Sequence, residues 1–126
     1  MKTVPLKVGG RTFALAFTLN AMCEMQDKIP NFDLNKLSDY VKTPDGLLDL
    51  LVIMARQGES LNDRELDVDR EWFGKHLSPS PRRMATIQIA LLNALAEGMR
   101  MDTEDDEEFE TDEVLNDIKK KETADG

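Results

Sequence analysis

The residues that could carry out catalysis are few, and the sequence places no activating partner beside any of them. His76 is the only histidine, and a catalytic base needs a nucleophile or an acid within hydrogen-bonding reach. Ser78 and Ser80 are close in sequence, but each precedes a proline, which favours a cap or a turn. We therefore expect His76 to lie at the edge of a helix and to pack beside Trp72.

Cys23 is the only cysteine, so it cannot form a disulfide within the chain. It falls on the predicted inner face of the first helix, where a cysteine behaves as a small hydrophobic residue. A nucleophilic role is the alternative, but no histidine is placed to activate the thiol. We expect Cys23 to be buried.

Residues 63–71 read DRELDVDRE and place an acid at every second position, as the start of a calcium loop does. The glycine required at the sixth position is Val68 here, and the bidentate glutamate of the twelfth position is Gly74. We therefore expect a solvated loop. Gly9-Gly10 is too short to cradle a phosphate. The sequence thus predicts no catalytic residue, no metal ligand and no cofactor.

The net charge of the chain lies entirely in its last 25 residues. Residues 102–126 carry 12 acidic side chains and 3 lysines, whereas residues 1–101 carry 13 basic and 13 acidic side chains. The tail therefore accounts for the whole net charge of −9. Such a composition offers little apolar surface to bury. We expect a compact body over residues 1–101 and a disordered acidic tail over residues 102–126.

This charge distribution also bears on partners and location. Binding to nucleic acid regardless of sequence needs clustered positive charge, so no nucleic acid is expected. No apolar run approaches the roughly 18–20 residues that span a membrane, and the N-terminus has no secretory signal. We expect a cytoplasmic protein that binds other proteins.

The N-terminal residues predict a β-hairpin. Residues 3–8 and 11–17 alternate apolar and other side chains on either side of Gly9-Gly10, which is typical of a two-residue turn. That loop places Leu6 opposite Phe13 and Val4 opposite Leu15, so the apolar residues share one face. Pro5 cannot donate a ladder hydrogen bond, which makes the first strand an edge strand.

Capping residues then predict a series of helices. Thr18 begins the first, in which Leu19, Met22, Cys23 and Gln26 follow helical spacing and Met25 and Ile29 extend the apolar side. Pro30 stops this helix. Asp33 caps a second helix. Thr43-Pro44-Asp45 begins a third, which is apolar nearly all round over residues 47–55 and is ended by Gly58. Residues 59–68 are expected to form a polar loop.

Two further helices complete the body. Asp69 caps a short one, and Ser80-Pro81 open the longest, over residues 81–97, which Gly98 closes. One stripe of this last helix consists of Met84, Ile87, Leu91, Ala94 and Leu95. The rest of its surface is nearly filled by Ala85, Ile89, Leu92 and Ala96. A helix this apolar must be covered by the core or by another subunit. The predicted fold is α+β and mostly α, with the hairpin packed on about four to five helices.

Several apolar residues are candidates for binding a partner. Trp72 and Phe73 either lie in the core or expose one ring as an anchor. Met99 and Met101 follow the last helix and can line an adaptable surface. In the tail, Thr111 predicts a short helix over residues 111–121 that is marginal alone and can fold on binding. The protein-binding candidates are Trp72, Phe73, Ile89, Leu92, Met99, Met101, Phe109, Val114, Leu115 and Ile118.

The N-terminal block LKVGGRTFALAFTLNAMCEMQ, residues 6–26, resembles the tail assembly chaperones of long-tailed bacteriophages and prophages. In that family a short hairpin leads into a helix of the form F-T-L-N-A-x-C-E-x-E. Residues 17–26 match this form, with Gln26 in place of the last acid. The helical middle and the acidic C-terminus also fit.

The resemblance implies a non-catalytic role. Such proteins coat the aggregation-prone tape-measure protein and help to recruit subunits of the major tail protein, which forms the tube. They act in the host cytoplasm, are absent from the mature virion, and self-associate. Many also exist in a longer form made by a ribosomal frameshift, and residues 119–121, three lysines, lie where a slippery codon run could sit.

Two other classes of function stay open on the residues alone. One is a different acidic-tailed interaction module, either an inhibitor that mimics nucleic acid or an antitoxin-like protein. The other is a small enzyme, for which no group of residues meets the geometric roles of a site.

Overall fold

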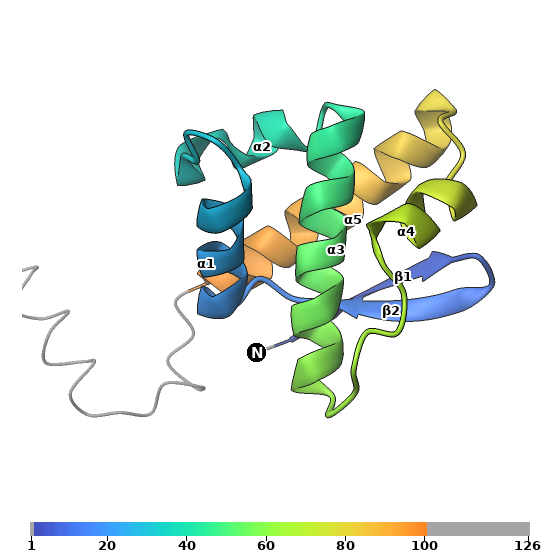
Figure 1. Cartoon of the computed structure of the whole chain (residues 1–126), viewed down its shortest axis with the longest axis horizontal. Coiled ribbons are helices and arrows are strands. Elements are labelled where there is room, and N and C mark those ends of the chain that lie inside the picture. The colour runs from blue at the N-terminus through green and yellow to red at the C-terminus, as the bar shows by residue number, and fades with distance from the viewer. Residues whose placement is uncertain (1, 101–126) are drawn as a thin grey trace, which may run out of the picture.

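The computed structural model describes residues 2–100, which enclose one hydrophobic core (Figure 1). The predicted class, mostly helical with an N-terminal hairpin, is confirmed. The tail helix predicted over residues 111–121 lies outside the described residues. The elements are, in chain order, β1 (Val4–Val8), β2 (Arg11–Leu15), α1 (Leu19–Lys28), the 3₁₀ helix η1 (Leu34–Lys36), α2 (Leu37–Tyr40), α3 (Pro44–Leu61), α4 (Arg70–His76) and α5 (Pro81–Met99).

The hairpin has the predicted register. Leu6 pairs with Phe13, and Val4 pairs with Leu15. Gly9 and Gly10 have φ angles of 58° and 78°, the left-handed values that a tight two-residue turn requires. Among the described residues β1 pairs only with β2, so β1 is an edge strand as Pro5 indicated. A two-stranded sheet needs a packing partner to be stable.

That partner is α3, which lies at the centre of the molecule (Figure 1). Thr43 caps it by accepting a hydrogen bond from the Gly46 amide at 3.1 Å, as predicted. The helix contacts β2 and helices α1, α2, α4 and α5. The middle of the helix is buried because these elements pack against it; the buried apolar residues are Leu47, Leu50, Leu51, Val52, Ile53, Met54 and Ala55.

Two glycines that were predicted to end helices instead lie inside them. The third helix continues past Gly58 to Leu61, and α5 continues past Gly98 to Met99. A Cβ on Gly58 would lie 2.0 Å from the Ala14 carbonyl oxygen, and one on Gly98 would lie 2.1 Å from the Phe17 carbonyl oxygen. These glycines therefore permit close approach of a helix to the hairpin strand and its exit.

The predicted polar loop over residues 59–68 is wrong at its start. Glu59 is a helical residue and is buried. Its carboxylate accepts a hydrogen bond from Arg64 Nε at 2.8 Å and forms an ion pair with Arg64. A buried carboxylate needs such a partner, because burial of an unpaired charge is costly. Arg64 thus folds back over the end of α3.

The inner face of α1 agrees with the prediction at Met25 and Ile29 but differs from it at Leu19 and Cys23. Ala21, Met25 and Ile29 are buried, whereas Cys23 is exposed and Leu19 is 75% exposed. Polar contacts with α3 set this orientation. The Thr18 hydroxyl donates to Gln57 Oε1 at 3.1 Å, and Gln57 Nε2 donates to Glu24 at 3.0 Å.

The remaining helices follow their predicted caps with one change. Asp33 accepts a hydrogen bond from the Asn35 amide, but it starts the 3₁₀ helix η1, and the single expected helix is divided into η1 and α2. Asp69 caps α4 by accepting from the Trp72 amide at 2.9 Å. Ser80 caps α5 by accepting from the Arg83 amide at 3.3 Å.

We expect Gly58→Ala to lower the free energy of unfolding by about 1–3 kcal/mol, because the methyl group overpacks the contact with Ala14. The matched control is Gly74→Ala in α4, whose added Cβ would meet only Leu48 Cδ1, at 3.6 Å. This change should stabilise by up to about 1 kcal/mol through helix propensity. Urea unfolding followed by circular dichroism measures both. Equal effects of the two substitutions would contradict the close approach at Gly58.

A candidate protein-interaction surface on α5

The outward face of α5 carries a continuous row of apolar residues. Its members, which we call the α5 seam, are Ala85, Ile89, Leu92, Ala96 and Met99. Their spacing of four, three, four and three residues keeps them within about 80° of one another around the helix. Ile89, Leu92 and Met99 keep 59%, 37% and 51% of their surface exposed. The seam thus extends for about 21 Å along α5.

The seam exists because α5 is apolar on two sides and the core uses only one. The buried side consists of Ile87, Ala90, Leu91, Ala94 and Leu95. The thirteen residues from Met84 to Ala96 include no charged side chain. Exposed helix surface is normally rich in charge, and depletion of charge distinguishes the centre of protein–protein interfaces. We therefore take the seam as the candidate site.

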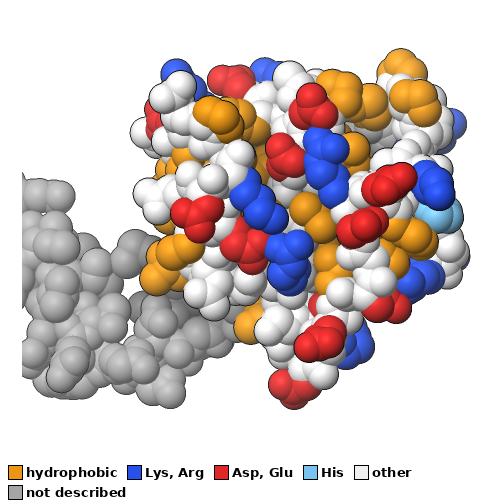
Figure 2. Space-filling view, viewed as in Figure 1, with side chains coloured by type: hydrophobic (Ala, Val, Ile, Leu, Met, Phe, Trp, Pro, Cys, Tyr) orange, Lys and Arg blue, Asp and Glu red, His pale blue; other side chains and the backbone are white. Residues whose placement is uncertain are grey.

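The face formed by α3 and α4 differs from the seam. Figure 2 shows acidic and basic side chains intermixed over α3 and α4. Arg70 on α4 pairs with Asp45 and Asp49 on α3 at 2.8 Å each. These hydrogen bonds, first to Asp45 and then to Asp49, raise the pKa of Arg70 above its ordinary value. Charges on this face are thus neutralised locally, and its polar surface is solvated.

The acid-rich stretch over residues 63–71 likewise serves structure. Asp67 accepts a hydrogen bond from Arg11 at 2.6 Å, which holds the pKa of this carboxyl group below its usual range. Asp69 is the cap of α4. Residues 2–100 contain no group of three or more histidine, cysteine or acidic side chains arranged to hold a metal ion.

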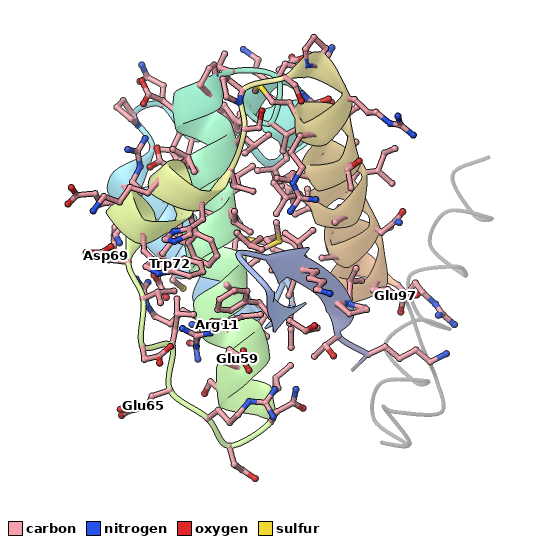
Figure 3. The ribbon with its side chains drawn as sticks, turned by 90° about the vertical axis from the view of Figure 1, so that its right-hand side faces the viewer. Arg11, Glu59, Glu65, Asp69, Trp72 and Glu97 are labelled. Atoms are coloured by element: carbon pink, nitrogen blue, oxygen red, sulfur yellow. The ribbon has the colours of Figure 1, made fainter. Side chains whose placement is uncertain are left out.

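Trp72 and His76 belong to an aromatic cluster between α4 and the hairpin. The Trp72 ring meets Phe13 edge-on at 5.6 Å and stacks on His76 at 4.1 Å. Arg11 lies 5.6 Å from the Trp72 ring, and Figure 3 shows the two side chains together. His76 Nδ1 lies 2.8 Å from the Trp72 carbonyl oxygen, so His76 packs beside Trp72 as predicted. The cluster fastens α4 to the hairpin.

A small apolar groove lies beside the other side of α5. It has a volume of about 240 Å³ and separates the start of α3 from the end of α4 and the first turns of α5. Its floor includes Leu48, Leu77 and Met84. A volume of this size accepts one or two side chains, whereas the seam offers a whole helix face. The groove is therefore the secondary feature.

The structure brings together three of the predicted binding residues and separates the others. Ile89, Leu92 and Met99 lie in the seam. Phe73 is fully buried, so the core alternative holds for it, while Trp72 is half-buried in the aromatic cluster. The candidates Met101, Phe109, Val114, Leu115 and Ile118 lie outside the described residues.

One feature near the seam had no signal in the linear sequence. β1 lies against α5, and Arg83 donates a hydrogen bond to the Lys7 carbonyl oxygen. Residues 2–8 and 81–100, which this contact brings together, carry five basic side chains: Lys2, Lys7, Arg82, Arg83 and Arg100. The only acid in these two ranges is Glu97, which pairs with Arg100. β1 and α5 thus carry an excess of basic residues although the body as a whole is neutral.

Comparison with protein-family models, curated proteins and solved structures gives no match for this chain. Within residues 2–100, no helix combines the length and apolarity needed to cross a bilayer. The geometry and the residues themselves therefore carry the functional argument.

Adjacent leucines test the two sides of α5. We expect Leu91→Ala to lower the free energy of unfolding by about 2–4 kcal/mol, because Leu91 is fully buried. Leu92→Ala should cost less than about 1 kcal/mol, because its side chain lies in the seam. Chemical denaturation of both variants measures the difference. A cost for Leu92→Ala as large as for Leu91→Ala would show that something covers the seam tightly in the isolated protein.

Proposed function

We propose that this protein is a non-catalytic tail assembly chaperone of a long-tailed bacteriophage or prophage and that the α5 seam binds its client, the tape-measure protein. The observation that carries the proposal is an uncharged, exposed apolar helix face on a body whose other surfaces carry many charged side chains. A chaperone of an aggregation-prone chain needs such a face, because the client's own apolar segments must be shielded from water.

The residues that carry the family resemblance support the proposal through their structural roles. Phe17 is buried, Thr18 caps α1, and Glu24 forms an ion pair with Arg56 of α3. Thr18 and Glu24 also both contact Gln57. The motif therefore fastens the hairpin and α1 to α3. Its residue types are explained by the fold, and the client-binding role is assigned to α5.

Many weak contacts suit a coating function. One seam offers a few apolar side chains, so a single contact is modest in energy. Several copies bound along one long client gain avidity without a tight individual site. The net charge of −9 keeps coated complexes apart by repulsion. Recruitment of the major tail protein and self-association belong to the same proposal.

Co-expression tests this function. The double variant Ile89→Glu/Leu92→Glu should lose the ability to keep the tape-measure protein in the soluble fraction, because charged side chains in the seam oppose apolar contact. The matched control is Gln26→Glu, which adds the same side chain at an exposed position of α1. Equal solubilisation by the double variant and the control would overturn the assignment of the seam.

A second candidate rests on the acidic residues 102–126, which suit a module that mimics nucleic acid and blocks a basic partner. Removal of these residues separates the two functions. A nucleic-acid mimic loses its partner, whereas the chaperone retains most of its binding to the tape-measure protein. Neighbouring genes for a tube protein and a very long protein would also favour the chaperone.

A further inference from the structure

The seam is an apolar helix face that the described residues leave uncovered, and most of the charged residues on α5 and the adjoining β1 segment are basic. Arg82 and Arg100 are 18 residues apart, which is five full helical turns, so they lie on one line along α5. Lys7 on the neighbouring strand β1 and Lys2 just before that strand are both exposed. A segment bound to the seam therefore contacts apolar side chains that have Arg82, Arg100, Lys2 and Lys7 nearby. We call these four residues the basic border.

We propose that the seam is covered by the chain's own C-terminal segment, residues 102–121. This segment combines the two properties that the surface selects. It has nine acidic residues over positions 102–113 and no basic residue there. It then supplies apolar side chains at helical spacing, Val114, Leu115 and Ile118, after Phe109. The acids face the basic border, and the apolar residues cover Ile89, Leu92 and Met99.

The length of the segment allows this contact. It begins directly after α5, at the end of the seam. The distance along α5 from Arg100 back to Arg82 is about 27 Å. Twelve extended residues span up to about 40 Å, so residues 102–113 can run back along the whole helix. A helix over residues 111–121 would be about 16 Å long, which fits within the seam.

Tethering and charge favour this occupant over a second copy of the chain. A segment joined to its site by a short linker has an effective concentration of about millimolar, so even a weak contact is populated. A symmetric pair of seams would instead place each basic border against its copy. It would also bring two tails of net charge −9 together. Like charges held close oppose that pairing.

The consequence is a cover that competes with any partner of the seam. A client must displace residues 102–121 from the seam, and the displaced acidic segment then returns to solvent. The contact does not depend on the identity of the client. It can therefore be true whether or not the protein acts in phage tail assembly.

Paramagnetic relaxation in the full-length protein tests the contact directly. The variant Cys23→Ser/Asn116→Cys carries one nitroxide in the segment and removes the exposed native thiol. We expect strong loss of the methyl signals of Ile89, Leu92 and Met99. The signals of Leu66, in the loop whose Asp67 contacts Arg11 on β2, should persist. High salt should restore part of the lost intensity, because it screens the acid–base contacts.

Control samples make the outcome decisive. Leu92→Glu in the labelled chain should restore the methyl signals of Ile89 and Met99, whereas Gln26→Glu should leave them broadened. A second sample mixes isotope-labelled chains that carry no nitroxide with nitroxide-labelled chains that carry no isotope. Only a contact between two chains can cause signal loss in this sample. Signal loss in that mixture would assign the seam to a second copy and overturn the proposal. Absence of broadening, or uniform broadening over the whole body, would overturn it as well.

Discussion

The structure depends on the burial of α3 by everything around it. A two-stranded hairpin cannot form a stable sheet alone, and short helices such as α2 and α4 cannot persist without tertiary contacts. Each gains stability by covering one side of α3. Its contact with the hairpin is close at Gly58, where the helix backbone meets the Ala14 carbonyl oxygen, and the Ala16 amide donates to the Met54 carbonyl oxygen at 3.0 Å beside it. This central position also explains why α5 has a spare face. One side of α5 completes the cover of α3, and the small body has no further layer to place on its other side.

The elements and most of their caps were predictable from the sequence because their signals are local. The Gly9-Gly10 turn fixes the hairpin register, and Thr18, Thr43, Asp69 and Ser80 each accept the backbone hydrogen bond expected of a cap. The helix ends predicted at Gly58 and Gly98 were wrong, because a glycine can either end a helix or allow another segment to pack closely against it. Only the tertiary contact decides between them. The face of α1 was wrong for a related reason, since polar contacts of Glu24 and Thr18 with α3 outweigh a shallow apolar pattern.

The candidate site was predictable in part. The sequence indicated that the last helix had more apolar surface than one core face needs, and it singled out Ile89, Leu92 and Met99. It gave no sign that β1 would border that helix, because Lys7 and Arg83 are far apart in the chain. A neutral total concealed a local excess of charge, because residues 2–8 and 81–100 carry five basic side chains and one acid. This local excess of basic residues is what makes the acidic segment a fitting neighbour for the seam.

An apolar helix face that is both uncharged and exposed is the physical basis of the whole account, and its use by a client is the central claim. Methyl cross-saturation measures that use most directly. Irradiation of a bound tape-measure segment transfers saturation to the methyl groups that touch it. The account predicts that Ile89, Leu92 and Met99 lose intensity while the groove residues Leu48, Leu77 and Met84 do not. Saturation confined to the groove, or found nowhere on α5, would contradict it.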